Sequence, residues 1–478
     1  MSLQTGKETI YKQDFQTSLE NSKQPQWLKA LREKAFAYFT ENGFPIVENE
    51  EWKYTNVAPM AKESFLLAEL SETIEDALET GELSEPSAAA DGLSSGKIQL
   101  QIESNAINSD AQPSAAADGS DFIFDESKDS VLIFANGQFD KKSSKLGAAQ
   151  RANILSFSAA LKNEKYAEIL KAKLGNLIDT EKNAFTALNT AFVGEGVLIH
   201  LPKNARIDAP VQLLFTTDEG KVSFPRVLIV ADEFAEATFV ETYVRSDETK
   251  YLTNAVVEIS VADEAKIKHF RVQRESHQAF HISTTAAEVG RGSVYDTTAI
   301  NLGAKLSRHD VLLKFNAEGG EAFVDGLYFL GEAQHHDTHS VIRHDVPNCT
   351  SHQTYKGILN DKSRGVFNGK VFVAVGASGT DGYQSNKNLL LSNEARVDTK
   401  PQLEIFNDDV KCSHGATVGQ LEEEELFYLL SRGLNDNLAR NLLTYGFAEE
   451  IINKIEIESI KKQLDEAVLN RLNVNLEA

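Results

Sequence analysis

The feature of this sequence that most restricts its fold is a stretch of about two hundred residues, from Val197 to Ile405, without a helical pattern. Apolar and polar residues alternate there over short runs such as VLIHL, RVLIV, ATFVETYV and HDVLLKF. Alternation rich in Val, Ile, Thr and Phe is typical of β-strands. Such a series of strands fits a β-sandwich or barrel, or a parallel β-helix. Few of its turns carry the Asn-Gly or Asp-Gly pairs of tight antiparallel hairpins, which favours the β-helix.

Helical patterns lie on both sides of this stretch. Apolar residues recur at three- and four-residue spacing over Gln24–Asn42, and Gly43 suits the left-handed end of that helix. Similar spacing predicts helices at Ser158–Leu174 and Thr180–Phe192, and again over the last seventy or so residues. Between them, Val131–Phe139 reads as two short strands around an Asn-Gly turn.

These patterns divide the chain into three parts. We expect a mixed α and β protein, with a helical domain at 1–195, a parallel β-helix core at 196–410 and a helical domain at 411–478. Residues 71–121 are rich in Ser, Ala, Asp and Glu and contain the heptapeptide PSAAADG twice. We interpret this segment as a low-complexity insertion in a surface loop of the first domain.

Composition restricts the partners. The chain has 48 Lys and Arg against 71 Asp and Glu, a formal charge of −23, which argues against binding nucleic acid or anionic membranes through its overall field. No apolar run approaches the roughly 20 residues of a membrane-spanning helix. The N-terminal residues have no targeting pattern, and the two cysteines, Cys349 and Cys412, form no disulfide framework. We therefore expect a cytoplasmic protein.

Motifs for catalysis are weak or missing. The run GVFNGKV (Gly365–Val371) resembles a phosphate-binding loop, but its spacing is too short and no Ser or Thr follows Lys370. No HExxH or CxxC motif is present. A carbohydrate-active enzyme on a β-helix would use paired carboxylates in a groove, and no such pair is recognisable. The sequence therefore favours a protein that is not an enzyme.

Histidines concentrate at one place. Five of the eleven lie between residues 335 and 352: His335, His336, His339, His344 and His352. In a strand, residues four apart are separated by about 13 Å, which is too far for ligands of one metal ion. A surface or inter-rung polar role is the favoured interpretation, and a metal site built with neighbouring strands is the alternative.

The pair Cys412 and His414 is a sharper signal. In a strand, residues two apart point to the same face, so the thiol and the imidazole would lie side by side. This pair of ligand types suits zinc, Cu(I) or an iron–sulfur unit. An iron–sulfur cluster usually takes four protein ligands, commonly thiolates, so a partner would have to supply the others. The alternative is a buried thiol beside a hydrogen-bonded histidine.

The residues around this pair resemble a known family. The segment EARVDTKPQLEIFNDDVKCSHGATVGQLEEEELFYLLSRGL (Glu394–Leu434) is similar to the SufB/SufD family of iron–sulfur cluster assembly proteins, and CSHGATVG resembles its SufD branch. The resemblance extends upstream through GVFNGKV and SNKNLLLS to AFTALNTAF (Ala184–Phe192) and EEWKYTNV (Glu50–Val57). It covers most of the chain, apart from the insertion at 71–121.

The resemblance implies a fold and a role. Family members have a right-handed parallel β-helix core between N-terminal and C-terminal helical domains. The SufD branch pairs with SufB, docks the ATPase SufC and forms a non-enzymatic scaffold for iron–sulfur clusters. The complex is associated with reduced flavin and receives sulfur from a cysteine desulfurase system.

The family's sites also map onto this sequence. The resemblance implies that His414 lies near a nascent cluster at the SufB interface, with Cys412 as a less secure ligand. It implies that SufC docks on the C-terminal region at Leu426, Phe427, Tyr428, Arg432, Gly433 and Leu434. Two alternatives remain: an interaction subunit with no direct cluster contact, and a homodimer when the chain is alone.

Overall fold

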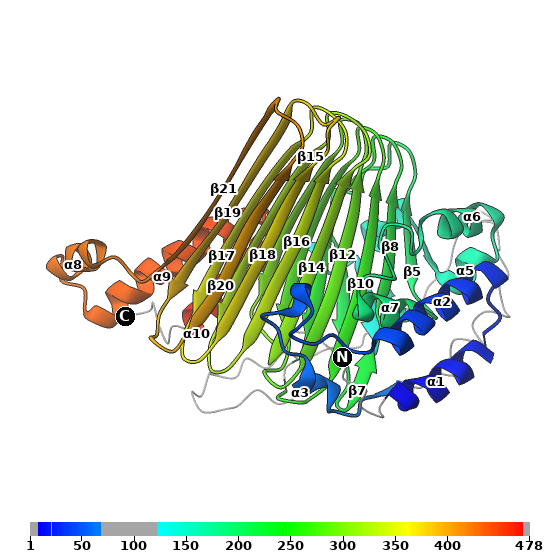
Figure 1. The fold of residues 1–478 in the computed structure, drawn as a ribbon, viewed down its shortest axis with the longest axis horizontal. Helices are drawn as coiled ribbons and strands as arrows, with labels where there is room; N and C mark the ends of the chain where they lie inside the picture. The colour runs from blue at the N-terminus through cyan, green and yellow to red at the C-terminus, as the bar shows by residue number, and fades with distance from the viewer. Residues whose placement is uncertain (1–7, 21, 68–121, 246, 472–478) are drawn as a thin grey trace, which may run out of the picture.

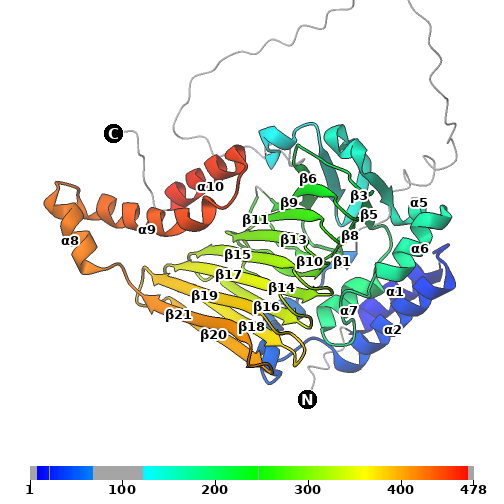
Figure 2. The same ribbon diagram turned by 90° about the horizontal axis from the view of Figure 1, so that it is seen from above.

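The computed structural model describes residues 8–20, 22–67, 122–245 and 247–471 (Figure 1). Its centre is a parallel β-helix made of two large sheets, which we call sheet A and sheet B. Helices from the two ends of the chain lie on opposite sides of this core (Figure 2). The expected mixed α and β fold, with a β-helix between helical regions, is confirmed. The insertion expected at 71–121 lies outside the described residues.

Strands alternate between the two sheets along the chain. Beyond the first rungs, each strand pairs in parallel with the next strand but one, so every turn of the β-helix adds one strand to each sheet. Paired residues therefore stack from rung to rung; Ser307 and His336, 29 residues apart, are direct partners. The strands from the first rung onward are β5 Val197–Leu201, β6 Val211–Thr216, β7 Lys221–Ser223, β8 Arg226–Ala231, β9 Glu236–Val244, β10 Leu252–Val261, β11 Lys266–Arg274, β12 Phe280–Val289, β13 Val294–Asn301, β14 Leu306–Phe315, β15 Glu321–Leu330, β16 His335–His344, β17 Thr350–Leu359, β18 Arg364–Val373, β19 Thr380–Leu390, β20 Arg396–Ile405 and β21 Val410–Gly419.

Alternate side chains of these strands fill the interior of the β-helix. In the first rungs they are apolar, and Leu213, Ile229 and Phe239 belong to one buried cluster. Further along, polar side chains enter the interior and bond to one another between rungs. His336 is fully buried and lies 2.7 Å from the hydroxyl of Ser307 through its Nδ1. Such hydrogen bonds between rungs satisfy buried polar side chains, whose burial without a partner would destabilise the fold.

The N-terminal end of the β-helix is closed by three further strands, two of which pair only antiparallel with their neighbours. These are β2 Val131–Ala135, β3 Gln138–Lys145 and β4 Asn153–Ser156. β2 forms a hairpin with β3 and also extends sheet B, while β4 pairs with β5 of sheet A. The hairpin turns at Asn136 (φ 51°) and Gly137 (φ 82°), which confirms the prediction of two strands around that turn. Phe134 stacks on Phe215 at 4.5 Å between ring centres and fills the interior at this end.

The N-terminal helices lie on the side of sheet A. α2 ends at Gly43 (φ 63°), as the sequence predicted, and α7 is buried along its whole length, next to α2 and β10. Aromatic residues of these helices and side chains of sheet A form one apolar cluster. The elements of this region are α1 Glu8–Glu20, α2 Gln26–Asn42, η1 Glu50–Trp52, α3 Ala58–Ala61, β1 Leu66–Leu67, α5 Phe157–Leu161, α6 Glu164–Lys173 and α7 Ala184–Ala191. Two short helices lie elsewhere: η3 Asp125–Ser127 next to sheet B and α10, and η4 Gly147–Arg151 between β3 and β4.

One helix prediction in this region is wrong. The sequence predicted a single helix over 158–174, but α5 ends at Leu161 and α6 begins at Glu164. Asn163 lies between them, and its side chain accepts a hydrogen bond from the backbone N–H of Tyr166. This cap starts a new helix, because Asn competes well for the free N–H groups of a first helical turn.

The C-terminal helices lie on the side of sheet B. α9 (Asp436–Ile452) and α10 (Glu458–Arg471) bury Ile451, Ile460 and Leu464 in a cluster with Phe270 and Ile300 of the sheet. α8 (Glu423–Ser431) projects beyond the last rung, away from the β-helix (Figure 2). We expected the core to end at 410, whereas β21 continues in register with β19 as far as Gly419. None of the helices in the described ranges has the length and apolar character needed to cross a bilayer.

Candidate functional site

The C-terminal end of the β-helix is open. β20 pairs with β18 and β21 with β19, and in the described chain neither strand has a partner on its other edge. No residue of β20 is fully buried, and most of β21 is exposed. The interior face of the last rung therefore meets solvent, together with two rows of free backbone donors and acceptors.

His414 lies on the inward face of this last rung. It is the direct partner of Gln384, a fully buried interior residue of the preceding rung. Because no rung follows among the described residues, the imidazole is exposed. It combines an inward direction with access from outside, which is the arrangement required of a ligand shared with a second protein.

Cys412 shares this face but not its surroundings. Its direct partner is Gly382, and a Cβ at that residue would lie 3.1 Å from the Cys412 sulfur. The side chain is half-buried against the apolar cluster of Val371 and Val373. Burial raises the pKa of the thiol above its ordinary value. The predicted arrangement on one face is confirmed, but the thiol lies against apolar side chains whereas the imidazole is exposed.

The α8–α9 hairpin carries exposed apolar side chains next to this open end. Phe427 is 72% and Tyr428 57% exposed, whereas Leu426 is buried. Arg432 lies over the ring of Tyr428 at 5.1 Å. The hairpin turns at Gly433, whose φ of 95° is unfavourable for other residues, and Leu434 is partly buried. Aromatic residues this exposed commonly mark a contact with a partner.

Two family models match the chain. The core domain of SufBD proteins of the SUF system for FeS cluster assembly matches residues 214–447, and the SufBD protein N-terminal region matches residues 5–76 and 124–213. The chain belongs to the SufBD family. An iron–sulfur cluster assembly SufBD family protein of Synechocystis sp. is 35% identical over 473 residues, which cover 92% of this chain and 94% of that protein. The iron–sulfur cluster assembly protein SufD of Escherichia coli is 37% identical over 240 residues, covering 50% of this chain and 57% of SufD.

The histidine-rich stretch of this SufBD chain serves the packing of rungs and of the N-terminal segment. His336 and His344 point inward and pair with hydroxyl groups, that of Ser351 in the case of His344. His335 and His339 point outward, toward the segment that carries Thr55 and Glu51. Within the described residues, no group of three or more His, Cys, Asp or Glu side chains is arranged to hold a metal ion. The inter-rung interpretation of this stretch agrees with these contacts.

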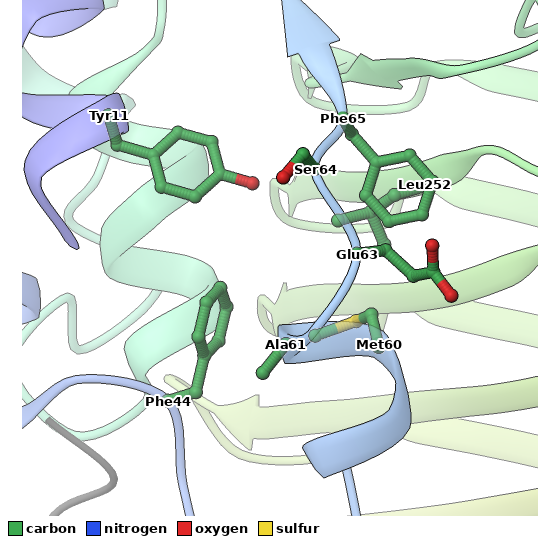
Figure 3. Close-up of a pocket in the computed structure, with 8 residues that line it drawn as sticks. All are labelled: Tyr11, Phe44, Met60, Ala61, Glu63, Ser64, Phe65 and Leu252. Atoms are coloured by element: carbon green, nitrogen blue, oxygen red, sulfur yellow. The ribbon is translucent and has the colours of Figure 1, made fainter. Parts of the chain in front are cut away.

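A small cavity lies between the N-terminal helices and sheet A (Figure 3). Its volume is about 10 Å³, enough for one water molecule. Tyr11 and Phe44 face Met60 and Phe65 across it, and the lining is mostly apolar. A flavin does not fit this cavity, so it gives no support to the flavin that the family resemblance implies.

Sequence reasoning missed two polar residues in the open end. Gln384 Oε1 and Thr399 Oγ1 are both buried atoms without a hydrogen-bond partner in the described part of the protein. Both lie in the last rungs, on β19 and β20. Their side chains carry no motif, and only the register of the β-helix brings Gln384 next to His414.

Proposed function

We propose that this chain is a SufD-like, non-enzymatic scaffold subunit of a SufBCD complex that assembles iron–sulfur clusters in the cytoplasm. In this proposal it pairs with SufB and docks the ATPase SufC. Membership of the SufBD family and the partial similarity to SufD support the assignment. The observation that carries it is the open last rung with an exposed, inward-facing His414.

The open end suits a partner of the same architecture. Two edge strands, one from each sheet, can each accept a strand from a second β-helix, so that both sheets continue across the interface. The side chains of the last rung would then become interior residues. A partner with an exposed last rung of its own is therefore the natural occupant, and we assign this place to SufB.

The cluster is the cargo of the proposed complex, and the chain would supply only part of its ligands. His414 is accessible and is our first candidate. Cys412 is the second, and its burial together with its raised pKa makes the thiolate less available. The remaining ligands would come from SufB, since a cluster usually requires four. Supply of sulfur by a cysteine desulfurase and a flavin on the complex remain predictions of the family resemblance.

Cluster formation tests the site. The chain is co-expressed with SufB and SufC, purified without oxygen, and its visible absorbance is recorded after reconstitution. We expect His414→Ala to lower the cluster content at least tenfold while the complex stays intact, and Cys412→Ala to have a smaller effect. Ser413→Ala, an exposed substitution on the same strand, is the matched control. Normal cluster content in His414→Ala would overturn the site assignment.

A second experiment tests the docking of SufC. We expect the double variant Phe427→Ala and Tyr428→Ala to lose SufC from the purified complex while it retains SufB. Val375, which is 76% exposed on the turn after β18, gives the control Val375→Ala. Loss of SufB together with SufC in the double variant would contradict separate docking surfaces.

The alternatives differ in measurable ways. An interaction subunit without cluster contact would bind SufB and SufC and be insensitive to both His414→Ala and Cys412→Ala. A homodimer through the open end would give twice the mass of the single chain in the absence of SufB, and SufB would replace the second copy. A chain that stays alone with SufB present would overturn the proposed pairing.

A further inference from the structure

Two glutamines form a short hydrogen-bonded ladder inside the last rungs. Gln353 donates through Nε2 to the hydroxyl of Ser340 at 2.7 Å, and Gln384 donates through Nε2 to Gln353 Oε1 at 2.7 Å. Both glutamines are fully buried. The carbonyl oxygen of Gln353 therefore accepts its hydrogen bond from the rung that follows it, and a donor for Gln384 would likewise come from the next rung.

A glycine makes room for the second glutamine. A Cβ at Gly369 would lie 2.3 Å from Gln384 Nε2 and 2.8 Å from the ring of Phe367. Gly369 belongs to the GVFNGKV run that faintly resembles a phosphate-binding loop. Its physical role here is to admit the amide of Gln384 into the interior, and this close packing fixes the orientation of that side chain.

The ladder stops at an unused acceptor. Gln384 Oε1 is buried and has no partner among the described residues, although a buried carbonyl oxygen usually accepts a hydrogen bond. The direct partner of Gln384 in the next rung is His414. The residue paired with Gly369 in the next rung is Pro401, which has no hydrogen-bonding side chain. The register thus brings the imidazole of His414, which carries a ring N–H, opposite Gln384, although the two side chains are not hydrogen-bonded in the structure.

We propose that Gln384 is a positioning residue for His414, and that its Oε1 accepts a hydrogen bond from one ring N–H of that histidine. A neutral imidazole carries one N–H and one lone pair, so a fixed N–H leaves the lone pair on the other nitrogen. That nitrogen would face the open end, ready to bind iron of the nascent cluster. Hydrogen bonds of this kind orient histidine ligands at metal sites generally. The inference rests on the proposed function, in which His414 is a ligand.

The tautomer of His414 is the direct test. The full-length chain is labelled with ¹⁵N-histidine, and two-bond ¹H–¹⁵N spectra are recorded at about pH 8, where free histidine is neutral. His414→Ala identifies the signal. We expect the ratio of the two tautomers to differ from that of free histidine by roughly five- to tenfold, the effect of one hydrogen bond. We expect this difference to disappear in Gln384→Leu and to persist in Gln384→Glu, which keeps an acceptor.

A control and a second readout separate this inference from the proposed function. Thr399→Val removes the other unpartnered polar atom of the open end and should leave the His414 signal unchanged. A wild-type tautomer ratio equal to that of free histidine would overturn the inference, even if Gln384→Leu fails to fold. So would a ratio that Gln384→Leu leaves unchanged. If the tautomer depends on Gln384 but His414→Ala does not reduce cluster content, the positioning stands and the ligand role fails.

Discussion

The two ends of the β-helix differ in whether further strands cover their terminal rungs. At the N-terminal end, the hairpin β2–β3 and strand β4 pair with the first rung, and stacked Phe134 and Phe215 fill the interior. At the C-terminal end, β20 and β21 have no further strand beside them among the described residues, and an inward-facing residue such as Val418 is 48% exposed. Stacked repeats need capping elements at both ends for solubility. The end without its own cap is therefore the one that we assign to a partner.

The interiors of the two ends also differ in polarity. The first rungs bury Leu, Ile and Phe, which need no partners, whereas the last rungs bury glutamine, asparagine and histidine ladders. A polar ladder is fully satisfied only when it continues into another rung. Gln384 lies in the second-last strand of sheet B in the described chain, and its Oε1 has no partner there, as expected if the polar interior continues into the proposed second protein.

The largest expected difference between the ends concerns apolar side chains. Phe134 is fully buried at the closed end, so Phe134→Ala should lower the free energy of unfolding by about 3–5 kcal/mol. Val418→Ala removes an inward-facing side chain at the open end and should change it by about 0.5 kcal/mol or less, because that side chain already meets water. Urea unfolding of the isolated chain measures both.

Equal losses in the two variants would mean that the last rung is covered in the isolated protein, as in a homodimer. Repeating the measurement over a range of protein concentrations distinguishes this outcome. Concentration dependence of the Val418→Ala effect identifies self-association, and its absence would require a cap from within the chain.

Ion pairs at the two ends offer a comparable contrast. Arg226 on β8 bonds to Glu258 at 2.6 Å, and both side chains are almost fully buried. Arg226→Met leaves the buried carboxylate of Glu258 without its charged partner and should lower the free energy of unfolding by about 3–5 kcal/mol. Lys370 on β18 bonds to Glu404 at 2.8 Å near the open end, where both are partly exposed. Lys370→Met should lower the free energy of unfolding by about 1 kcal/mol or less. Thermal unfolding of the two variants measures both effects.

Much of the fold could be predicted from the sequence, because each rung repeats a pattern that is visible locally. The long alternation, the scarcity of hairpin turns, the Asn136–Gly137 turn and the end of α2 at Gly43 all rest on neighbouring residues. The His414 and Cys412 pair was visible for the same reason. Three features could not be predicted, because they depend on contacts between rungs about 30 residues apart, which no local pattern records. They are the surroundings of Cys412, the unpartnered oxygen of Gln384 and the strand β21.

Glycines of the last rungs give a third, smaller contrast. Gly369→Ala would force a Cβ to within 2.3 Å of Gln384 Nε2. Because interior side chains would have to shift, we expect the free energy of unfolding to fall by about 1–3 kcal/mol. Gly415 lies on the outer face of β21, and a Cβ there meets nothing within 4 Å. Gly415→Ala should therefore be neutral within about 0.5 kcal/mol, as measured by thermal unfolding. A loss in Gly415→Ala equal to that in Gly369→Ala would mean that the outer face of β21 is covered, contrary to the free space found there.

The smallest expected effect is a pH dependence on the outer face of sheet A. His339 lies 3.1 Å from Asp337 Oδ1 and 3.3 Å from Glu51 Oε2, and Arg308 also faces it. Burial and Arg308 lower the pKa of His339, but the charge of Asp337 and hydrogen bonds to both carboxylates outweigh them, so the pKa is raised. His335 nearby has its pKa lowered to about 4 by burial, and it stays neutral near pH 7.

The sign of this effect follows from the raised pKa. Protonated His339 stabilises the docked segment fully below the pKa of the unfolded chain, near 6.5, and the contribution is lost as pH rises through the folded pKa. Trp52 reports on the segment, because its ring lies 3.8 Å from the guanidinium of Arg308. In a Trp27→Phe background we expect Trp52 fluorescence to change as the pH rises above about 6.5 and through the raised pKa of His339, with a stability difference of about 1 kcal/mol. His339→Gln should abolish this dependence. If the pH dependence persists in that variant, the group that titrates is not His339, and the protonation of His339 does not control the docking of the N-terminal segment.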